Sequence, residues 1–134
     1  MLVIEDNESD VFLIREAIDN ASFPVSVRVV NDGEQAVRFF DLADQDMTIP
    51  CPALVILDIN LPKKQGAEVL KHMRQSRRCG RALVIVASTS ESVRDREQME
   101  SLGANRYFRK PSDYEQFMRL GEIVRSLLAA RLPE

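Results

Sequence analysis

The sequence alternates short, wholly apolar runs with amphipathic stretches along its length. Runs such as Met1–Ile4 and Ala53–Leu57 have the length and composition of strands that are buried on both faces of a sheet. Between the runs, apolar residues recur at helical spacing. Strands that alternate with helices predict βαβ units and a parallel sheet. Because crossovers between parallel strands are almost always right-handed, helices should cover both faces of that sheet.

The predicted order is five strands and five helices in strict alternation, which is a doubly wound α/β fold. Strands are expected at Met1–Ile4, Val25–Val29, Ala53–Leu57, Ala82–Ala87 and Arg106–Phe108. Helices are expected after Asn7 or Ser9, after Asp32, and over about Gly66–Arg77, Ser92–Leu102 and Tyr114–Ala130. The stretch Asp41–Pro52 is predicted to be a long polar connection, and Gly103 to end the fourth helix in the left-handed conformation.

Length and composition narrow the class of protein. A chain of 134 residues favours one domain over residues 1–134, and 45% apolar with 29% charged residues is an ordinary globular balance. A net charge of −3 predicts no bulk attraction to nucleic acid or to an anionic membrane. No segment approaches the ~20 apolar residues of a membrane span, and the early Glu5 does not fit a secretory signal. We therefore expect a cytoplasmic protein.

Two smaller groups of residues are predicted to carry no special chemistry. Cys51 and Cys79 have no neighbouring cysteine or histidine, so they indicate neither a disulfide framework nor a zinc site, and free thiols are expected. Five basic residues are predicted to form a solvated face: Lys63, Lys64, Arg77, Arg78 and Arg81.

The residues that follow the predicted strands are the candidates for function, because ligands of an open parallel sheet bind beyond the carboxyl ends of its strands. Those ends carry Glu5-Asp6, Asp58, Ser88-Thr89 and Lys110-Pro111. Each has an ordinary alternative: the acidic pair favours a helix start, the hydroxyls can cap a helix, and the lysine can be solvated. None of these alternatives explains why all four lie at strand ends.

The residue types suggest one kind of chemistry. Three clustered carboxylates repel each other, and a hard divalent ion with oxygen ligands, Mg²⁺, relieves that repulsion. Asp58 lies between apolar neighbours at the end of a central strand, which suits a nucleophile that forms an acyl phosphate. Glu5 and Asp6 would then serve the metal. The ammonium of Lys110 would offset charge on the transferred group.

With these motifs the chain resembles the response-regulator receiver family of two-component signalling, across essentially its whole length. Glu5-Asp6 is similar to the acidic pair after the first strand in that family. Asp58 stands in Leu-Asp-Ile-Asn-Leu-Pro, with Gly66 eight positions later. Ser88 lies 30 residues after Asp58, and Lys110 lies 22 after Ser88, as in the family.

The resemblance implies a role for each of these positions. Asp58 would be the phosphoacceptor, and Ser88 and Lys110 would contact the phosphoryl group. Mg²⁺ would be held by Glu5, Asp6, Asp58 and the backbone carbonyl of Asn60. Tyr107 falls at the position of the switch aromatic, for which simple packing is the alternative. The Lys110–Pro111 bond is typically cis in the family.

The resemblance also implies a partner and an output. The phosphoryl group would come from a sensor histidine kinase, and the chain would catalyse at most its own phosphorylation and dephosphorylation. Homodimerisation or docking on a partner would follow through the fourth helix, the fifth strand and the last helix. Ser92–Leu102, with Val93, Met99 and Leu102 as its main apolar anchors, is the expected moving part.

A closer resemblance is to the stand-alone receivers that serve phytochrome-type kinases. It rests on the extended Asp41–Pro52 connection, the Asn60–Lys64 run and the Ser88–Ser90 triplet.

Three rival functions fit less well. A phosphohydrolase with an aspartyl phosphate needs a second aspartate as general acid two positions after the nucleophile, where this chain has Asn60. A flavin-binding module needs a phosphate cradle after the first strand, where Glu5-Asp6-Asn7-Glu8 would repel phosphate. A receiver that acts only as a scaffold would not need the complete set of acidic pair, Asp58, Ser88 and Lys110.

Overall fold

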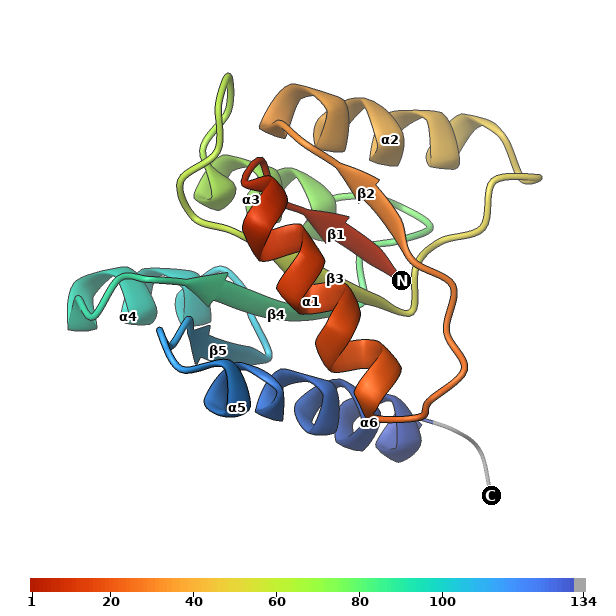
Figure 1. The fold of residues 1–134 in the computed structure, drawn as a ribbon. Coiled ribbons are helices and arrows are strands. Elements are labelled where there is room, and N and C mark those ends of the chain that lie inside the picture. The colour runs from red at the N-terminus through yellow and green to blue at the C-terminus, as the bar shows by residue number, and fades with distance from the viewer. Residues whose placement is uncertain (132–134) are drawn as a thin grey trace.

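The computed structural model describes residues 1–131, and a five-stranded parallel sheet lies at its centre (Figure 1). The strands are β1 (Leu2–Ile4), β2 (Arg28–Val30), β3 (Leu54–Leu57), β4 (Leu83–Ser88) and β5 (Arg106–Arg109). Their order is β2-β1-β3-β4-β5, and each pair of neighbours is parallel. The predicted doubly wound α/β fold is confirmed.

Helices alternate with the strands as expected. They are α1 (Glu8–Asn20), α2 (Gly33–Gln45), α3 (Gly66–Arg74), α4 (Val93–Ser101), α5 (Tyr114–Phe117) and α6 (Arg119–Arg131). The last predicted helix is thus one turn, α5, followed by the 13-residue helix α6. Only Met118 separates them, and its N–H donates to the Tyr114 carbonyl at 3.0 Å, so helical bonding continues across the junction. No helix within residues 1–131 is long and apolar enough to cross a membrane.

Helices cover both faces of the sheet (Figure 1), and the sheet separates two apolar cores. Alternate residues of each strand point to opposite faces, so Val3 and Ile56 pack with α1, α5 and α6, whereas Ile4 and Leu57 pack with α2, α3 and α4. Every residue of β1, β3 and β4 is buried. Burial of one such aliphatic side chain contributes roughly 1.5–3 kcal/mol. The central strands therefore form a rigid base for the residues at their ends.

The second helix is longer than predicted. It continues to Gln45, because Phe40 and Ala43 are still buried in the core, whereas Asp41 and Leu42 between them are exposed. Residues 41–45 of the predicted connection therefore belong to the helix, and the rest of it, up to Pro52, connects α2 to β3 as predicted.

Helix α4 is weakly attached to the body of the protein. Met99 is its one buried residue. Val93, the first residue of the helix, is 67% exposed, so its prediction as an anchor is wrong. Gly103 follows the helix with φ +103°, the predicted left-handed conformation. The small buried surface agrees with a helix of low local stability.

The expectation of free thiols is wrong, because Cys51 and Cys79 form a disulfide with sulfur atoms 1.99 Å apart. The two cysteines are 28 residues apart in sequence. Cys51 precedes β3 and Cys79 precedes β4, and these strands are neighbours. The sheet therefore brings together two residues whose sequence spacing gave no sign of pairing.

The prediction that Lys63, Lys64, Arg77, Arg78 and Arg81 form a solvated face is wrong for Arg78. Arg78 is half-buried, and its guanidinium donates to the carbonyls of Asp46 and Ile49 at 3.0 Å and to that of Ala43. These carbonyls lie at the end of α2 and just after it, so Arg78 satisfies acceptors that the helix leaves open. Its role is structural.

Candidate functional site

Backbone pairing continues past the ends of the strands and fixes the residues that follow them. The N–H of Glu5 donates to the Val30 carbonyl at 3.1 Å, and the N–H of Asp58 donates to the Ile4 carbonyl at 3.1 Å. The N–H of Lys110 donates to the Ser88 carbonyl at 2.7 Å. Each of these residues is therefore held in register with its neighbouring strand at the same edge of the sheet.

Three carboxylates come together at this edge. Glu5, Asp6 and Asp58 each offer one oxygen, and these oxygens lie within 4.8 Å of one another. Glu5 and Asp58 are buried, whereas Asp6 is exposed. Three such oxygens suit a small divalent cation that keeps water on its open side. The arrangement is suited to a divalent cation, and the roles of Glu5, Asp6, Asp58 and the Asn60 carbonyl as Mg²⁺ ligands stay a prediction.

The side chain of Lys110 points into the same cluster. Its Nζ lies 2.6 Å from Oε2 of Glu5, 2.8 Å from Oδ2 of Asp10 and 3.6 Å from Oδ2 of Asp58. The sequence did not single out Asp10. An acidic residue in the first turn of a helix is explained by the helix dipole alone, so no signal distinguished it from Glu8.

Burial and charge have opposite effects on the pKa values of Glu5 and Lys110. Burial raises the pKa of Glu5 to about 7, although the hydrogen bond and charge of Lys110 act in the opposite direction. Burial disfavours the charged form of Lys110, but hydrogen bonds to Asp10 and Glu5 and the charge of Asp58 outweigh it, so its pKa is raised. The lysine is thus a fixed positive charge beside Asp58.

The loop after β4 links Ser88 to Tyr107. Ser88 is buried, and its Oγ accepts from the N–H of Ser90 at 3.2 Å. The hydroxyl of Tyr107 donates to the Ser90 carbonyl at 3.0 Å, and the guanidinium of Arg96 lies 5.5 Å from the centre of the Tyr107 ring. A change at Ser88 can therefore reach Tyr107 through one short loop. The switch role of Tyr107 stays a prediction.

The loop after β3 packs tightly against Asp58. The N–H of Asn60 faces Oδ1 of Asp58 at 3.4 Å, and the N–H of Gly66 donates to the Ile59 carbonyl at 2.7 Å. A Cβ at position 66 would lie 2.3 Å from the carbonyl oxygen of Asp58. Only glycine allows α3 to begin this close to Asp58.

The expected cis bond between Lys110 and Pro111 is not found. No peptide bond within residues 1–131 is cis, so this bond is trans. That expectation came from the family resemblance, since an X–Pro bond can adopt either form.

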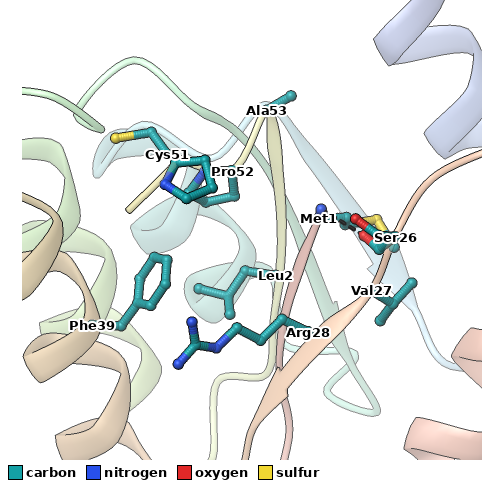
Figure 2. A pocket seen from close by; sticks show the side chains of 10 residues that line it. Met1, Leu2, Ser26, Val27, Arg28, Phe39, Cys51, Pro52 and Ala53 are labelled. Atoms are coloured by element: carbon teal, nitrogen blue, oxygen red, sulfur yellow. Dashed lines mark hydrogen bonds between the residues drawn. The ribbon is translucent and has the colours of Figure 1, made fainter. Parts of the chain in front are cut away.

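A cavity of about 440 Å³ lies at the opposite edge of the sheet. Leu2 of β1, Arg28 of β2 and Phe39 of α2 surround it (Figure 2). The guanidinium of Arg28 lies 5.1 Å from the centre of the Phe39 ring. None of the candidate residues after the strand ends lines this cavity, so the cavity and the candidate site lie at opposite edges of the sheet.

An open parallel sheet with an acidic trio, a lysine and a hydroxyl at its carboxyl edge defines a class of phosphoryl-accepting signalling domain. The model of the response regulator receiver domain matches residues 1–120, and the chain belongs to this family of two-component signalling switches.

Individual members of the family show which receivers this chain is similar to. Response regulator Rcp1 of Synechocystis sp. is 29% identical over 126 residues, which cover 94% of this chain and 86% of Rcp1. The crystal structure of the phosphorylated cyanobacterial phytochrome response regulator RcpA has a TM-score of 0.85 at 30% identity and covers 98% of this chain and 94% of that one. The Mn²⁺-bound form of Rcp1 has a TM-score of 0.84 at 27% identity, with 98% and 95% covered. The predicted likeness to phytochrome-associated response regulators is confirmed.

Proposed function

We propose that this chain is a response regulator whose Asp58 accepts a phosphoryl group from a sensor histidine kinase. The observation that carries the proposal is the convergence of Lys110 and three carboxylates on one sheet edge, with Nζ of Lys110 3.6 Å from Asp58. Similarity to RcpA, a phosphorylated phytochrome response regulator, supports a kinase of the phytochrome type.

In the proposed step an ionised oxygen of Asp58 attacks the phosphorus of a phosphohistidine. A bond from Oδ of Asp58 to phosphorus forms while the bond from phosphorus to the imidazole nitrogen breaks. The electron pair stays on that nitrogen, which takes a proton from water. Lys110 and the hydroxyl of Ser88 then face the oxygens of the new acyl phosphate.

Glu5, Asp6 and Asp58, with the backbone carbonyl of Asn60, are the residues that would hold Mg²⁺. When bound, the ion would neutralise charge on the phosphoryl oxygens. The Mn²⁺-bound Rcp1 structure supports a divalent cation in this family. Since the ligands here are all oxygen atoms, we assign Mg²⁺ as the resident ion.

The signal would then pass from Ser88 to Tyr107 and α4. The new anion attracts the Ser88 hydroxyl, and the loop between β4 and α4, which Tyr107 contacts, moves with it. Helix α4, which buries only Met99, then changes position. The output surface is α4, β5 and the helices that follow, where a second copy or a downstream partner would dock. Residues 1–134 would act as one cytoplasmic receiver unit, with no catalysis beyond their own phosphorylation and dephosphorylation.

Acetyl phosphate tests the proposal without the kinase. The protein is incubated with Mg²⁺ and acetyl phosphate, and its intact mass is measured. We expect the wild type to gain the mass of one phosphoryl group, and Asp58→Asn to gain none. Asp19→Asn, which removes an exposed carboxylate from the far end of α1, is the matched control and should behave as wild type.

Two results would overturn the proposal. One is the absence of any mass gain in wild type with Mg²⁺ present. The other is a gain that survives in Asp58→Asn. Rapid, continuous release of phosphate without a stable phosphorylated form would favour a hydrolase instead.

A further inference from the structure

Asp10 is a fourth carboxylate at the site and belongs to no motif that the sequence revealed. Its Oδ2 accepts a hydrogen bond from Nζ of Lys110 at 2.8 Å. The lysine side chain is 5% exposed and that of Asp10 23%, so the contact is largely shielded from water.

The side chain of Asp10 does not cap its own helix. The cap of α1 is Asn7, whose side chain accepts from the N–H of Asp10 at 3.0 Å. In a capping box, the side chain at the position of Asp10 would accept the N–H of the cap residue in return. Here Glu5 faces that N–H instead, at 3.2 Å, and Asp10 is free to hold Lys110.

The ammonium of Lys110 lies closer to Glu5 and Asp10 than to Asp58. An ammonium has three N–H donors. Glu5 and Asp10 receive short, charge-assisted hydrogen bonds, whereas Asp58 lies at 3.6 Å, beyond hydrogen-bonding distance. In this state the lysine is held toward α1 and not toward the phosphoacceptor.

We propose that Asp10 is a positioning residue that holds the Lys110 ammonium in the unphosphorylated protein and competes with the phosphoryl group for it. The inference rests on the proposed function of Asp58. A phosphoryl group on Asp58 draws the ammonium, now 3.6 Å from Asp58, toward residue 58, and this shift weakens its bond to Asp10. Asp10 thereby favours the unphosphorylated state.

Binding of fluoroberyllate, a phosphoryl analogue, tests this directly. With Mg²⁺ present, we expect the Kd of fluoroberyllate, followed by fluorine NMR, to fall roughly tenfold in Asp10→Asn, because one charge-assisted competitor is lost. A residue that only supports the structure would weaken binding when removed. Asp10→Ser, which also removes the acceptor charge, should tighten binding in the same direction.

Two further variants serve as controls. Glu8→Gln removes a charge from the same helical turn, but Glu8 is exposed and does not contact Lys110, so its effect should stay below about twofold. Asp10→Glu keeps the acceptor and should stay near the wild-type Kd. Unchanged or weaker binding in both Asp10→Asn and Asp10→Ser would overturn the proposal, as would equal tightening in Glu8→Gln.

The two proposals fail in different ways. If wild type binds no fluoroberyllate, or Asp58→Asn binds it equally well, the assignment of Asp58 falls and the role of Asp10 falls with it. If wild type binds through Asp58 and the Asp10 variants do not bind more tightly, only the role of Asp10 is refuted.

Discussion

The ammonium of Lys110 lies 2.6 Å from the carboxylate of Glu5, across 105 residues of sequence. Their side chains are 5% and 2% exposed, so the pair is shielded from water. Removal of either partner would leave a charge buried beside Asp58. The pair therefore couples the first strand to the last at the point where the phosphoryl group is to bind.

Binding of Mg²⁺ should depend on pH through Glu5. Burial raises the pKa of Glu5 to about 7, so below that pH the metal-free carboxyl carries a proton that a cation must displace. The affinity for Mg²⁺ should fall as pH decreases from about 8 to about 6, by up to roughly tenfold per unit below the pKa. Calorimetric titration in buffers of different ionisation enthalpy measures both the affinity and the released proton.

Glu5→Gln is the control for this pH dependence. It should bind Mg²⁺ more weakly at every pH and lose most of the change between about pH 8 and 6. Equal affinity of the wild type at both pH values would refute the role of Glu5.

The hydroxyl of Tyr107 should hold the loop between β4 and α4. Tyr107→Phe removes its 3.0 Å hydrogen bond to the Ser90 carbonyl but leaves the ring in place under Arg96. Such a bond contributes about 1 kcal/mol, so amide exchange in the loop and the first turn of α4 should become roughly fivefold faster. Hydrogen exchange with mass spectrometry measures this.

Tyr114→Phe is the matched control, because its hydroxyl contacts Glu16 of α1 and not the loop. Exchange in the loop should remain as in wild type. If the Tyr107 variant shows the same protection as wild type, the loop is held by other contacts and Tyr107 has no role in transmission.

The disulfide between Cys51 and Cys79 should stabilise the fold without affecting the site. Closing a loop of 28 residues restricts the unfolded chain, which is worth about 3.6 kcal/mol. Reduction should lower the free energy of unfolding, measured with urea, by that amount. Phosphorylation of the folded protein should be unchanged, because the cysteines precede β3 and β4 whereas the site follows the strands.

A variant with both cysteines changed to alanine gives the comparison for reduction. Its stability should not respond to reducing agent. Two free thiols in the protein prepared without reductant, or an unchanged free energy on reduction, would contradict the bond.

Gly66→Ala should disturb the nucleophile. The new Cβ would lie 2.3 Å from the carbonyl oxygen of Asp58, so the backbone at residue 58 must move. We expect a loss of about 1–3 kcal/mol in stability. Phosphorylation by acetyl phosphate should slow by roughly tenfold, because Asp58 leaves its productive position.

Gln65→Ala is the neighbouring control, since this exposed residue makes no capping bond with its side chain. Its stability should remain within about 0.5 kcal/mol of wild type. A Gly66 variant that is as stable and as reactive as wild type would show that α3 need not approach Asp58 so closely.

The fold and most of the site could be predicted because both follow from local patterns. Apolar runs located the buried strands, and the residue after each strand end located Glu5, Asp58 and Lys110. What could not be predicted depends on contacts between distant segments. Nothing near Cys51 indicated Cys79, and nothing near Asp10 distinguished it from an ordinary acidic residue at a helix start. Val93 was misplaced because its helix has too few apolar residues to define an inner face.

The most direct test of the central claim is the position of the phosphoryl group in the wild-type protein. After treatment with Mg²⁺ and acetyl phosphate, borohydride reduces an aspartyl phosphate to homoserine, and fragment mass spectrometry locates the new residue. We predict homoserine at position 58 and at no other aspartate. Homoserine at another position, or an unmodified residue 58 in protein that has gained the mass of a phosphoryl group, would contradict the assignment.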